Sequence, residues 1–514
     1  MSGPLNGLLR LAIVASVAWS ASAIAADAVV SSPNCNETGF VTAFNNVQAG
    51  GGGTITFSCG SSPVTITFSS YRSVSANVVI DGANRITFDG SDAYAFFQIS
   101  NGDSLSLKNL TLQRGAFNSV HALENFGALN LSRVTIKDNV STDVAIDNFG
   151  AIYATSSTFS GNGTVNSNSN QHGGALRNDG GTVQISNSTF SNNAVNAGGS
   201  GEGGAISNAS GDSQIISSSF TNNEAFDGGA VQISSGTVTV KSSTFTNNAA
   251  GYGAGIENDG GGVFVSTGTF TDNTSSSGDG GAIWNLFGTS TIDSSQFVGN
   301  HAATKGGAIS CYGSTLTLTN SAFSTNQSGD TGGAVFSECG LTAINNTFYS
   351  NSAAGLGGGA VYQDSSQNAV MTYATIVGNS ASTFGGGIYN NDGLGGTLTL
   401  SKSIISTNTG GNCDGDIVSG GYNLSNDMGC GGVFTGSDRS NATLPFGTFT
   451  NNGGPTSTLL PKSGNQAVNF IPLSQCQIDR DQRDAARPAG NACDSGAVEL
   501  NGIFDAIFAS GFEL

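Results

Sequence analysis

Aromatic residues recur at one fixed position, directly after a repeated Gly-Gly-Ala (or Gly)-aliphatic motif. Four such side chains are present, with Ser310 between the first two: Trp284, Phe336, Tyr362 and Tyr389. Neighbouring side chains of an extended strand point to opposite faces, so a buried aliphatic residue turns the next side chain outward. We therefore expect an aromatic stripe on one outer face, suited to stacking on sugar rings or contacting a partner protein. Two alternatives stay open: ring stacking that only stiffens the fold, or a turn that places the rings inside.

The eight cysteines fall into four local couples. The couples are Cys35 with Cys59, Cys311 with Cys339, Cys413 with Cys430, and Cys476 with Cys493. The separation of Cys311 and Cys339 is close to one sequence repeat, and strands about 4.8 Å apart lie within disulfide reach. A zinc site is the rival interpretation, but no couple has metal-ligand spacing and the chain holds only three histidines. We predict disulfides and assign no metal ligand.

Acidic residues do not form an evident catalytic pair. Glycoside hydrolysis uses two carboxylates about 5 to 9.5 Å apart. Glu202, Asp227 and Asp279 each precede a Gly-Gly motif, but Tyr252 interrupts them and Lys305 follows. Pectate lyase chemistry needs basic residues, and residues 140–400 contain only three lysines and arginines: Arg177, Lys241 and Lys305. We assign no catalytic residue and no cofactor.

Composition excludes several classes of partner. The chain of 514 residues has a formal charge of −19, with only 16 lysines and arginines, so nucleic acid and anionic membrane surfaces are poor partners. Glycine is abundant, at 76 residues, and charged residues make up only 10%. Such a composition is typical of a β-rich, turn-rich chain.

A repeat of 23 to 31 residues organises most of the chain. Its second mark is an asparagine three places after an apolar residue, at Asn139, Asn162, Asn193, Asn223, Asn248, Asn273, Asn300, Asn326, Asn351, Asn379 and Asn408. Between the marks lie short alternating runs such as Thr315-Leu-Thr-Leu318, which are strand-forming. Two or three strands per repeat predict an all-β fold, a parallel β-helix of about fourteen coils and on the order of 65 Å long.

The marker residues suit the turns and the interior of such a coil. Paired glycines permit positive φ or close backbone approach. Asparagine tolerates the left-handed conformation, and stacked asparagines hydrogen-bond from coil to coil. The phenylalanine of the second mark is expected to stack with its counterparts inside the coil.

Both ends of the chain differ from the repeats. An apolar run after Arg10 and small residues up to Ala26 indicate a signal peptide over residues 1–26; a membrane anchor is the alternative, but the run is too short to span a bilayer. Residues 27–116 hold a predicted cap, with Phe40, Ala43, Phe44 and Val47 on one helical face, and the first coils.

The later part of the chain divides into four segments. Regular coils fill residues 117–408, and a transition follows at 409–451. Residues 452–500 concentrate the charge, with arginines and aspartates mixed, which favours an ion-paired cap over the last coil rather than a binding site. Residues 501–514 form a phenylalanine-rich tail, either a sorting signal or a last strand on the cap.

The repeated Gly-Gly-Ala-Ile and Phe-x-x-Asn pair resembles the repeats of polymorphic outer membrane proteins, which build right-handed parallel β-helices related to the pectin-lyase-like fold. Residues 452–499, with Asn-Gly-Gly-Pro-Thr, Asp-Gln-Arg-x-x-x-Arg-Pro and Cys-Asp-x-Gly-Ala-Val-Glu, resemble the choice-of-anchor Q domain of bacterial secreted β-helix proteins. Together the two resemblances imply a right-handed solenoid capped at both ends, on an exported, extracellular or cell-surface protein.

We expect an adhesion or interaction module that binds a polysaccharide, a cell-surface glycan or a protein. Parallel β-helices also host polysaccharide lyases and glycoside hydrolases, so a polysaccharide-degrading enzyme is the alternative. A passive structural surface protein is a third possibility and predicts no ligand. Neither a transmembrane helix nor a nucleic-acid partner is expected, and the sequence leaves the oligomeric state open.

Overall fold

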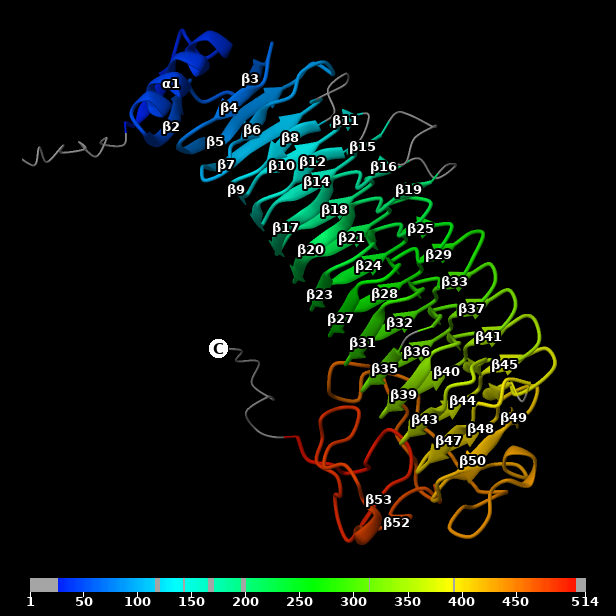
Figure 1. The fold of residues 1–514 in the computed structure, drawn as a ribbon. Helices are drawn as coiled ribbons and strands as arrows, with labels where there is room; N and C mark the ends of the chain where they lie inside the picture. Colours follow the sequence, from blue (N-terminus) through cyan, green and yellow to red (C-terminus); the bar gives the residue numbers. More distant parts are fainter. Residues whose placement is uncertain are drawn as a thin grey trace, which may run out of the picture.

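The structure, a computed structural model, describes residues 26–115, 121–141, 144–164, 171–195, 200–313, 315–391 and 393–504. The predicted signal peptide and most of the tail lie outside these ranges. The chain is 4% helical and forms a parallel β-solenoid of about 14 turns, shown as a curved stack in Figure 1. The predicted all-β parallel β-helix of about fourteen coils is confirmed.

Each regular coil contains three principal strands and one short strand. In one coil these are β30 (Ile283–Asn285), β31 (Thr289–Asp293), β32 (Gln296–Val298) and β33 (His301–Ala302). Each strand pairs in parallel with its counterpart one repeat later. Ile283 of β30, for example, lies in register with Ile309 of the next coil. Strict alternation of apolar and polar residues produces this arrangement, because one face of every strand must point into the interior.

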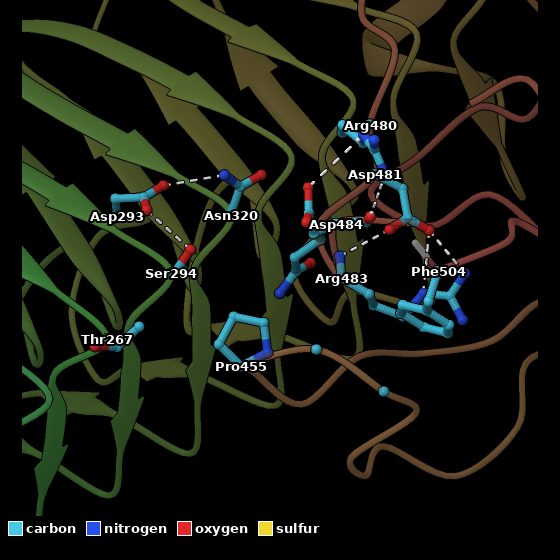
Figure 2. Close-up of a pocket in the computed structure, with 13 residues that line it drawn as sticks. Thr267, Asp293, Ser294, Asn320, Pro455, Arg480, Asp481, Arg483, Asp484 and Phe504 are labelled. Carbon is cyan, nitrogen blue, oxygen red and sulfur yellow. Dashed lines mark hydrogen bonds and ion pairs between the residues drawn. The ribbon is translucent and has the colours of Figure 1, made fainter. Parts of the chain in front are cut away.

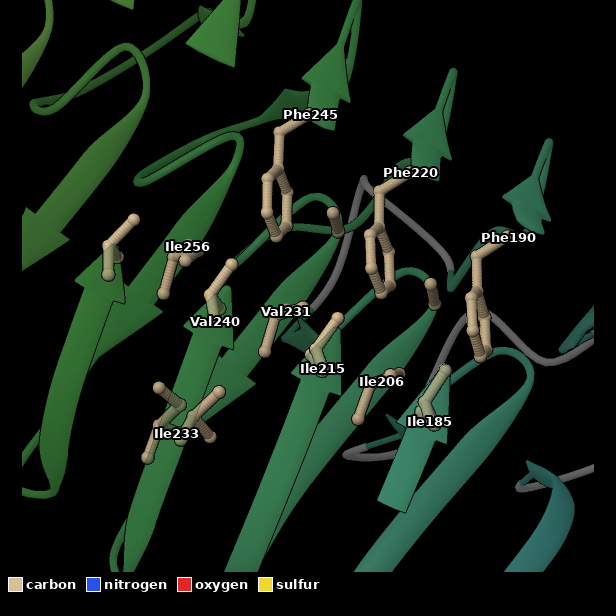
Figure 3. Close-up of a cluster of buried hydrophobic side chains, with 14 of the residues drawn as sticks. Ile185, Phe190, Ile206, Ile215, Phe220, Val231, Ile233, Val240, Phe245 and Ile256 are labelled. Atoms are coloured by element: carbon tan, nitrogen blue, oxygen red, sulfur yellow. The ribbon is translucent and has the colours of Figure 1, made fainter. Parts of the chain in front are cut away.

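A column of eight phenylalanines runs through that interior. They occupy the middle of the third strand in successive coils: Phe159, Phe190, Phe220, Phe245, Phe270, Phe297, Phe323 and Phe348. Neighbouring ring centroids lie 4.3 to 4.9 Å apart and the ring planes differ by only 3° to 9°. Figure 3 shows three of these rings stacked beside Ile215 and Val240. The predicted stacking is confirmed.

A column of buried asparagines lies beside the phenylalanines. From Asn139 to Asn408, each marker asparagine donates from Nδ2 to Oδ1 of the next at 2.9 to 3.0 Å. The same nitrogen also bonds a main-chain carbonyl, as Asn248 does with the oxygen of Phe220 at 3.1 Å. The predicted coil-to-coil ladder of asparagines is confirmed, and it satisfies polar groups that no water reaches.

The paired glycines divide two tasks between them. Gly280 has φ of 65°, a left-handed conformation, whereas a Cβ on Gly281 would lie 2.1 Å from the carbonyl oxygen of Gly307. The expectation that the marker asparagine itself takes positive φ was wrong. The preceding residue does so instead, for example Asn247 with φ of 53°, while Asn248 keeps its side chain inside for the ladder.

An amphipathic helix covers the N-terminal end of the stack. Helix α1 (Glu37–Ala49) begins at Asn36, whose side chain accepts a hydrogen bond from the Gly39 amide. As predicted, Phe40, Ala43, Phe44 and Val47 are its buried residues. They pack over the first coils, where they shield the open end of the hydrophobic interior (Figure 1).

The C-terminal segment, residues 452–500, was expected to cover the last coil. It lies along the flank of several coils instead. Gln482 accepts from Thr347 of β40 (Thr347–Tyr349) at 2.5 Å, and the Ser457 amide donates to Gln296 of β32 at 3.2 Å. Figure 1 shows this segment in orange and red beside the end of the stack. Polar side chains of the coils therefore fix the segment to the side of the solenoid.

All four predicted cysteine couples form disulfides. The Cα atoms lie 5.8 Å apart in Cys35–Cys59 and in Cys311–Cys339, 4.7 Å apart in Cys413–Cys430 and 6.0 Å apart in Cys476–Cys493. Cys311 and Cys339 cross-link adjacent coils, and no cysteine of the described chain is left free. The pairing leaves no thiol for the zinc alternative.

Candidate functional site

One column of outward side chains follows the whole length of the solenoid, and we call it the outer column. It comprises the residue directly after the buried aliphatic residue of each first strand. The strands are β6 (Phe97–Ile99), β8 (His121–Asn125), β12 (Val144–Asn148), β17 (Leu176–Ser186), β20 (Ile206–Ile216), β22 (Val231–Ile233), β26 (Ile256–Asn258), β30, β34 (Ile309–Cys311), β38 (Val335–Ser337), β42 (Val361–Gln363) and β46 (Ile388–Asn390).

The outer column changes in chemistry along its length. In register it reads Gln98, Glu124, Asp147, Arg177, Ser207, Gln232, Glu257, Trp284, Ser310, Phe336, Tyr362 and Tyr389. The half toward the N-terminus is charged and polar, and the half toward the C-terminus is mostly aromatic. All four aromatic residues singled out from the sequence therefore lie in one column.

The aromatic half contains one continuous group and one separate pair. Phe336 and Tyr362 have ring centroids 5.7 Å apart, and Tyr362 and Tyr389 have centroids 5.0 Å apart. Ser310 separates Trp284 from this group, and the indole instead contacts Tyr252 at 4.6 Å. Trp284 and Tyr389 are partly exposed, whereas Phe336 is 1% and Tyr362 7% exposed. Two of the four rings therefore reach the surface, and the binding role of the stripe stays a prediction.

A second row of side chains, which we call the leading row, lies over the outer column. It comprises the residue directly before each Gly-Gly motif: His172, Glu202, Asp227, Tyr252, Asp279, Lys305, Thr331, Gly357 and Phe384. The Gly-Gly turn brings the leading row onto the strand, since a Cβ on Gly280 would meet the backbone nitrogen of Trp284 at 2.8 Å. The glycine motif thus places two rows of side chains against each other on one face.

Side chains of the leading row and the outer column contact each other around Phe336. Lys305 Nζ lies 4.2 Å from the centroid of the Phe336 ring and 3.8 Å from Glu338 Oε1. Asp279 accepts hydrogen bonds from the Thr304 and Tyr312 hydroxyl groups. Burial and the Asp279 carboxylate raise the pKa of Tyr312, so its hydroxyl stays a proton donor. Phe336 therefore supports its neighbours rather than offering a free surface.

The N-terminal half of the outer column gathers charged groups that the sequence analysis did not connect. Glu124 accepts from Gln98 at 2.7 Å, His121 Nε2 lies 3.3 Å from the Asp147 carboxylate, and Arg177 lies 3.2 Å from Asp179. Arg177 follows a complete glycine motif, Gly173-Gly174-Ala175-Leu176, whereas the strands that carry Glu124 and Asp147 lack one. The signal that identifies them is the position after the inward aliphatic residue.

Four carboxyl groups converge where the charged half meets the aromatic half. Glu257 of the outer column lies beside Asp227 and Glu202 of the leading row and beside Asp259. Burial, then the charges of Asp227, Asp259 and Glu202, raise the pKa of Glu257, and the Gln232 side chain opposes this by hydrogen bonding. Burial and the charges of Glu202 and Asp259 raise the pKa of Asp227 to about 6.

Only part of this carboxyl group set was visible in the sequence. Glu202 and Asp227 were noted before their Gly-Gly motifs, but Tyr252 interrupted the series. Glu257 lies in register with Trp284, one coil earlier. The predicted aromatic stripe begins at Trp284 and therefore does not include it. Across the described part of the chain, no group of three or more His, Cys, Asp and Glu side chains is arranged to hold a metal ion.

A separate pocket lies between the flank of the solenoid and the C-terminal segment (Figure 2). It measures about 650 Å³ and is bordered by Asn320 and Asp293 on the coils and by Pro455 and Phe504 on the segment. Its arginine Arg483 is 2.7 Å from Asp481 and also donates to the Glu499 carbonyl oxygen at 2.8 Å. These contacts hold the segment together.

Comparison with known proteins identifies the repeat. The family model of the Chlamydia polymorphic membrane protein repeat matches residues 267–286 and 294–312. A search of curated proteins and a search of solved structures return no match. No helix in the described ranges has the length and apolar character needed to cross a membrane. The matched stretches include Trp284 and the Phe297-Val-Gly-Asn300 mark, so this chain carries polymorphic membrane protein repeats within a parallel β-solenoid.

Proposed function

We propose that this protein is an exported or cell-surface β-helix that binds glycans through the outer column and the leading row. The observation that carries the proposal is an aromatic series that lies outside the hydrophobic interior yet stays in register. Tyr252 and Trp284 form one contact pair on this face, and Phe384, 44% exposed, contacts Tyr389 at 6.0 Å further along. Aromatic faces at two points along a rod suit an extended polymer more than a compact molecule.

The solenoid supplies rigidity to these two aromatic groups. Each coil is hydrogen-bonded to its neighbours through strands and through the asparagine ladder, which fixes the spacing of the side chains. A surface that is already ordered before binding loses little conformational entropy when a ligand binds. Phe336 and Tyr362 are buried, and Tyr362 packs against Tyr389 and supports the second of the two exposed groups.

Export and surface location are supported by two observations. The four disulfides fit an oxidising environment outside the cytoplasm, and the matched repeat belongs to a membrane protein family by its description. The signal peptide over residues 1–26, the right-handed winding and the choice-of-anchor Q identity of residues 452–500 belong to this proposal as predictions. Mass spectrometry of the exported protein tests the signal peptide, whose removal should leave a chain beginning near Asp27.

A glycan panel tests the binding proposal. Purified residues 27–514 should be retained on a subset of polysaccharides, and Trp284→Ala with Tyr389→Ala should weaken retention about tenfold or more, because each exposed aromatic group loses one of its two rings. Phe264→Ala is the matched control, since Phe264 is 44% exposed on β27 (Gly262–Ser266), outside the outer column. Retention that is unchanged in the double variant, with the fold intact, would remove the aromatic series as the binding surface.

The same panel separates the alternatives. New reducing or unsaturated ends in the bound polysaccharide would identify a degrading enzyme, and the raised pKa of Asp227 beside Glu257 makes these two carboxyl groups its candidate acids. Absence of retention on every glycan would leave protein binding or the passive structural protein. Retention without cleavage supports the proposal.

A further inference from the structure

The four carboxyl groups are arranged along the solenoid axis, on the face that carries the outer column and the leading row. Glu202 and Asp227 occupy the leading row of adjacent coils and are paired in register. Glu257 lies in β26, one coil after Gln232, and Asp259 follows directly behind β26. Because coils repeat at the inter-strand distance of about 4.8 Å, the carboxyl groups extend over about 10 Å.

These carboxyl groups have little compensating positive charge. His172 contacts Glu202 at 2.8 Å, but no Lys, Arg or His among the described residues forms an ion pair with Asp227, Glu257 or Asp259. The buried acid of the C-terminal segment differs in this respect, since Glu499 Oε2 lies 3.4 Å from Arg487 Nε. Uncompensated acids on a folded surface repel one another and oppose folding.

Glu257 adds a second and independent observation. Its side chain is 2% exposed, and Oε2 has no hydrogen-bond partner although it faces the charges of Asp227, Asp259 and Glu202. A buried carboxyl oxygen without a partner is unfavourable. Trp284 Nε1, on the next coil, is also buried without a partner. A donor and an acceptor are thus unsatisfied at neighbouring positions.

We propose that Glu202, Asp227, Glu257 and Asp259 bind the protonated amino groups of a glycan built from deacetylated amino sugars. An ammonium group donates up to three hydrogen bonds and supplies the missing positive charge. The Tyr252 and Trp284 rings, 4.6 Å apart on the adjacent coils, provide the aromatic face that favours a cation or the sugar ring next to it. Carboxyl groups on three successive coils match a polymer with an amino group on each unit.

This inference rests on the proposed function and is tested with glucosamine oligomers, N-acetylglucosamine oligomers and polylysine. At pH 7 the glucosamine oligomer should bind at least about tenfold more tightly than its acetylated counterpart, because acetylation removes the charge. Asp227→Asn with Glu257→Gln should abolish this preference and leave the N-acetylglucosamine affinity within about twofold. Asp212→Asn with Asp272→Asn is the control of equal charge change, since both side chains are exposed away from the cluster.

Proton release gives a readout that general charge attraction does not. An ammonium group bound at the cluster lowers the pKa of Asp227 and Glu257, so binding near pH 6 should release protons. The neighbouring groups Glu202, Asp259 and His172 contribute to this release and are present in both variants. Calorimetry in two buffers of different ionisation enthalpy measures the release, which the double variant should lose.

The outcomes distinguish this inference from the proposed function. Equal binding of both oligomers that still depends on Trp284 and Tyr389 would overturn the amino-sugar inference and keep glycan binding. Binding of polylysine alone would overturn it in favour of a basic protein partner. No binding of either oligomer, together with no retention of the unsubstituted protein on any polysaccharide of the panel, would overturn both.

Discussion

The inner phenylalanine column and the outer column run through the same coils but obey different constraints. Inside, one residue type repeats eight times with ring planes within 9° of parallel. Outside, ring contacts such as those of Phe336 with Tyr362 and Tyr362 with Tyr389 are tilted by 24° and 34°, and acids, an arginine and serines share the column. Closed packing fixes the residue type inside, whereas the outer position leaves chemistry free to vary.

This contrast indicates where recognition is located. A column in which every coil presents the same ring offers identical, buried surfaces and carries no information for a ligand. A column that changes from charged to aromatic presents a distinct sequence of groups along the rod. The residue type is therefore constant in the hydrophobic interior, whereas it varies from coil to coil in the outer column.

Removing one inner ring should have the largest effect. Phe245 is fully buried between Phe220 and Phe270, so Phe245→Ala opens a cavity and should lower the free energy of unfolding by about 3 to 5 kcal/mol. Tyr389→Ala, at the partly exposed end of the outer column, should cost less than about 1 kcal/mol. Chemical denaturation measures both, and similar losses in the two variants would remove the distinction between the columns.

Breaking the asparagine ladder should cause the second largest loss in the free energy of unfolding. Asn248→Ala removes the side-chain bond to Asn273 and the bond to the Phe220 carbonyl, and it leaves the buried main-chain amide of Asn223 without an acceptor. We expect a loss of about 2 to 4 kcal/mol in the free energy of unfolding. The control is Asn222→Gly, an exposed neighbour with φ of 54°, where glycine is tolerated and the change should stay within about 0.5 kcal/mol.

Hydrogen exchange locates the effect of the Asn248 change. Because each coil contacts only its neighbours, amides of the coils around Asn248 should lose protection while those near α1 keep it. Uniform loss along the whole solenoid would instead show that the stack unfolds as one unit.

The difference between the columns also explains what the sequence predicts. Periodic features were predictable, because the fold, the phenylalanine stack and the asparagine ladder follow from the repeat spacing. The four disulfides follow from the grouping of the cysteines into local couples. Glu257 was missed because a charged residue at an outward position follows no periodic rule. The flank contacts of Gln482 with Thr347 link residues 135 positions apart, and no local pattern encodes them. The prediction of positive φ is wrong by one residue at these turns. Two polar residues are adjacent there, as at Asn247 and Asn248, and the sequence does not show which of them takes the left-handed conformation.

The smallest effect, and the one of opposite sign, is expected at Asp227 of the leading row, next to the outer column. The pKa of Asp227 is raised from 3.8 to about 6 by burial and by neighbouring acids, so the ionised form is disfavoured in the folded protein. The penalty is absent below about pH 3.8, grows as the pH rises and is complete above about pH 6. Asp227→Asn should therefore raise the free energy of unfolding by about 1 to 2 kcal/mol at pH 7.5, after allowance for solvent screening, and leave it unchanged at pH 3.5.

Denaturation at the two pH values measures this gain, and Asp212→Asn provides an exposed aspartate that should show none. A gain of equal size at pH 3.5 would mean that charge is not its origin. A gain confined to pH 7.5 would mean that the carboxyl cluster on the outer face lowers the stability of the fold, whereas every inner substitution loses stability. Such a result would support the proposal that these acids serve binding, because binding and active sites commonly contain groups that lower the stability of the fold.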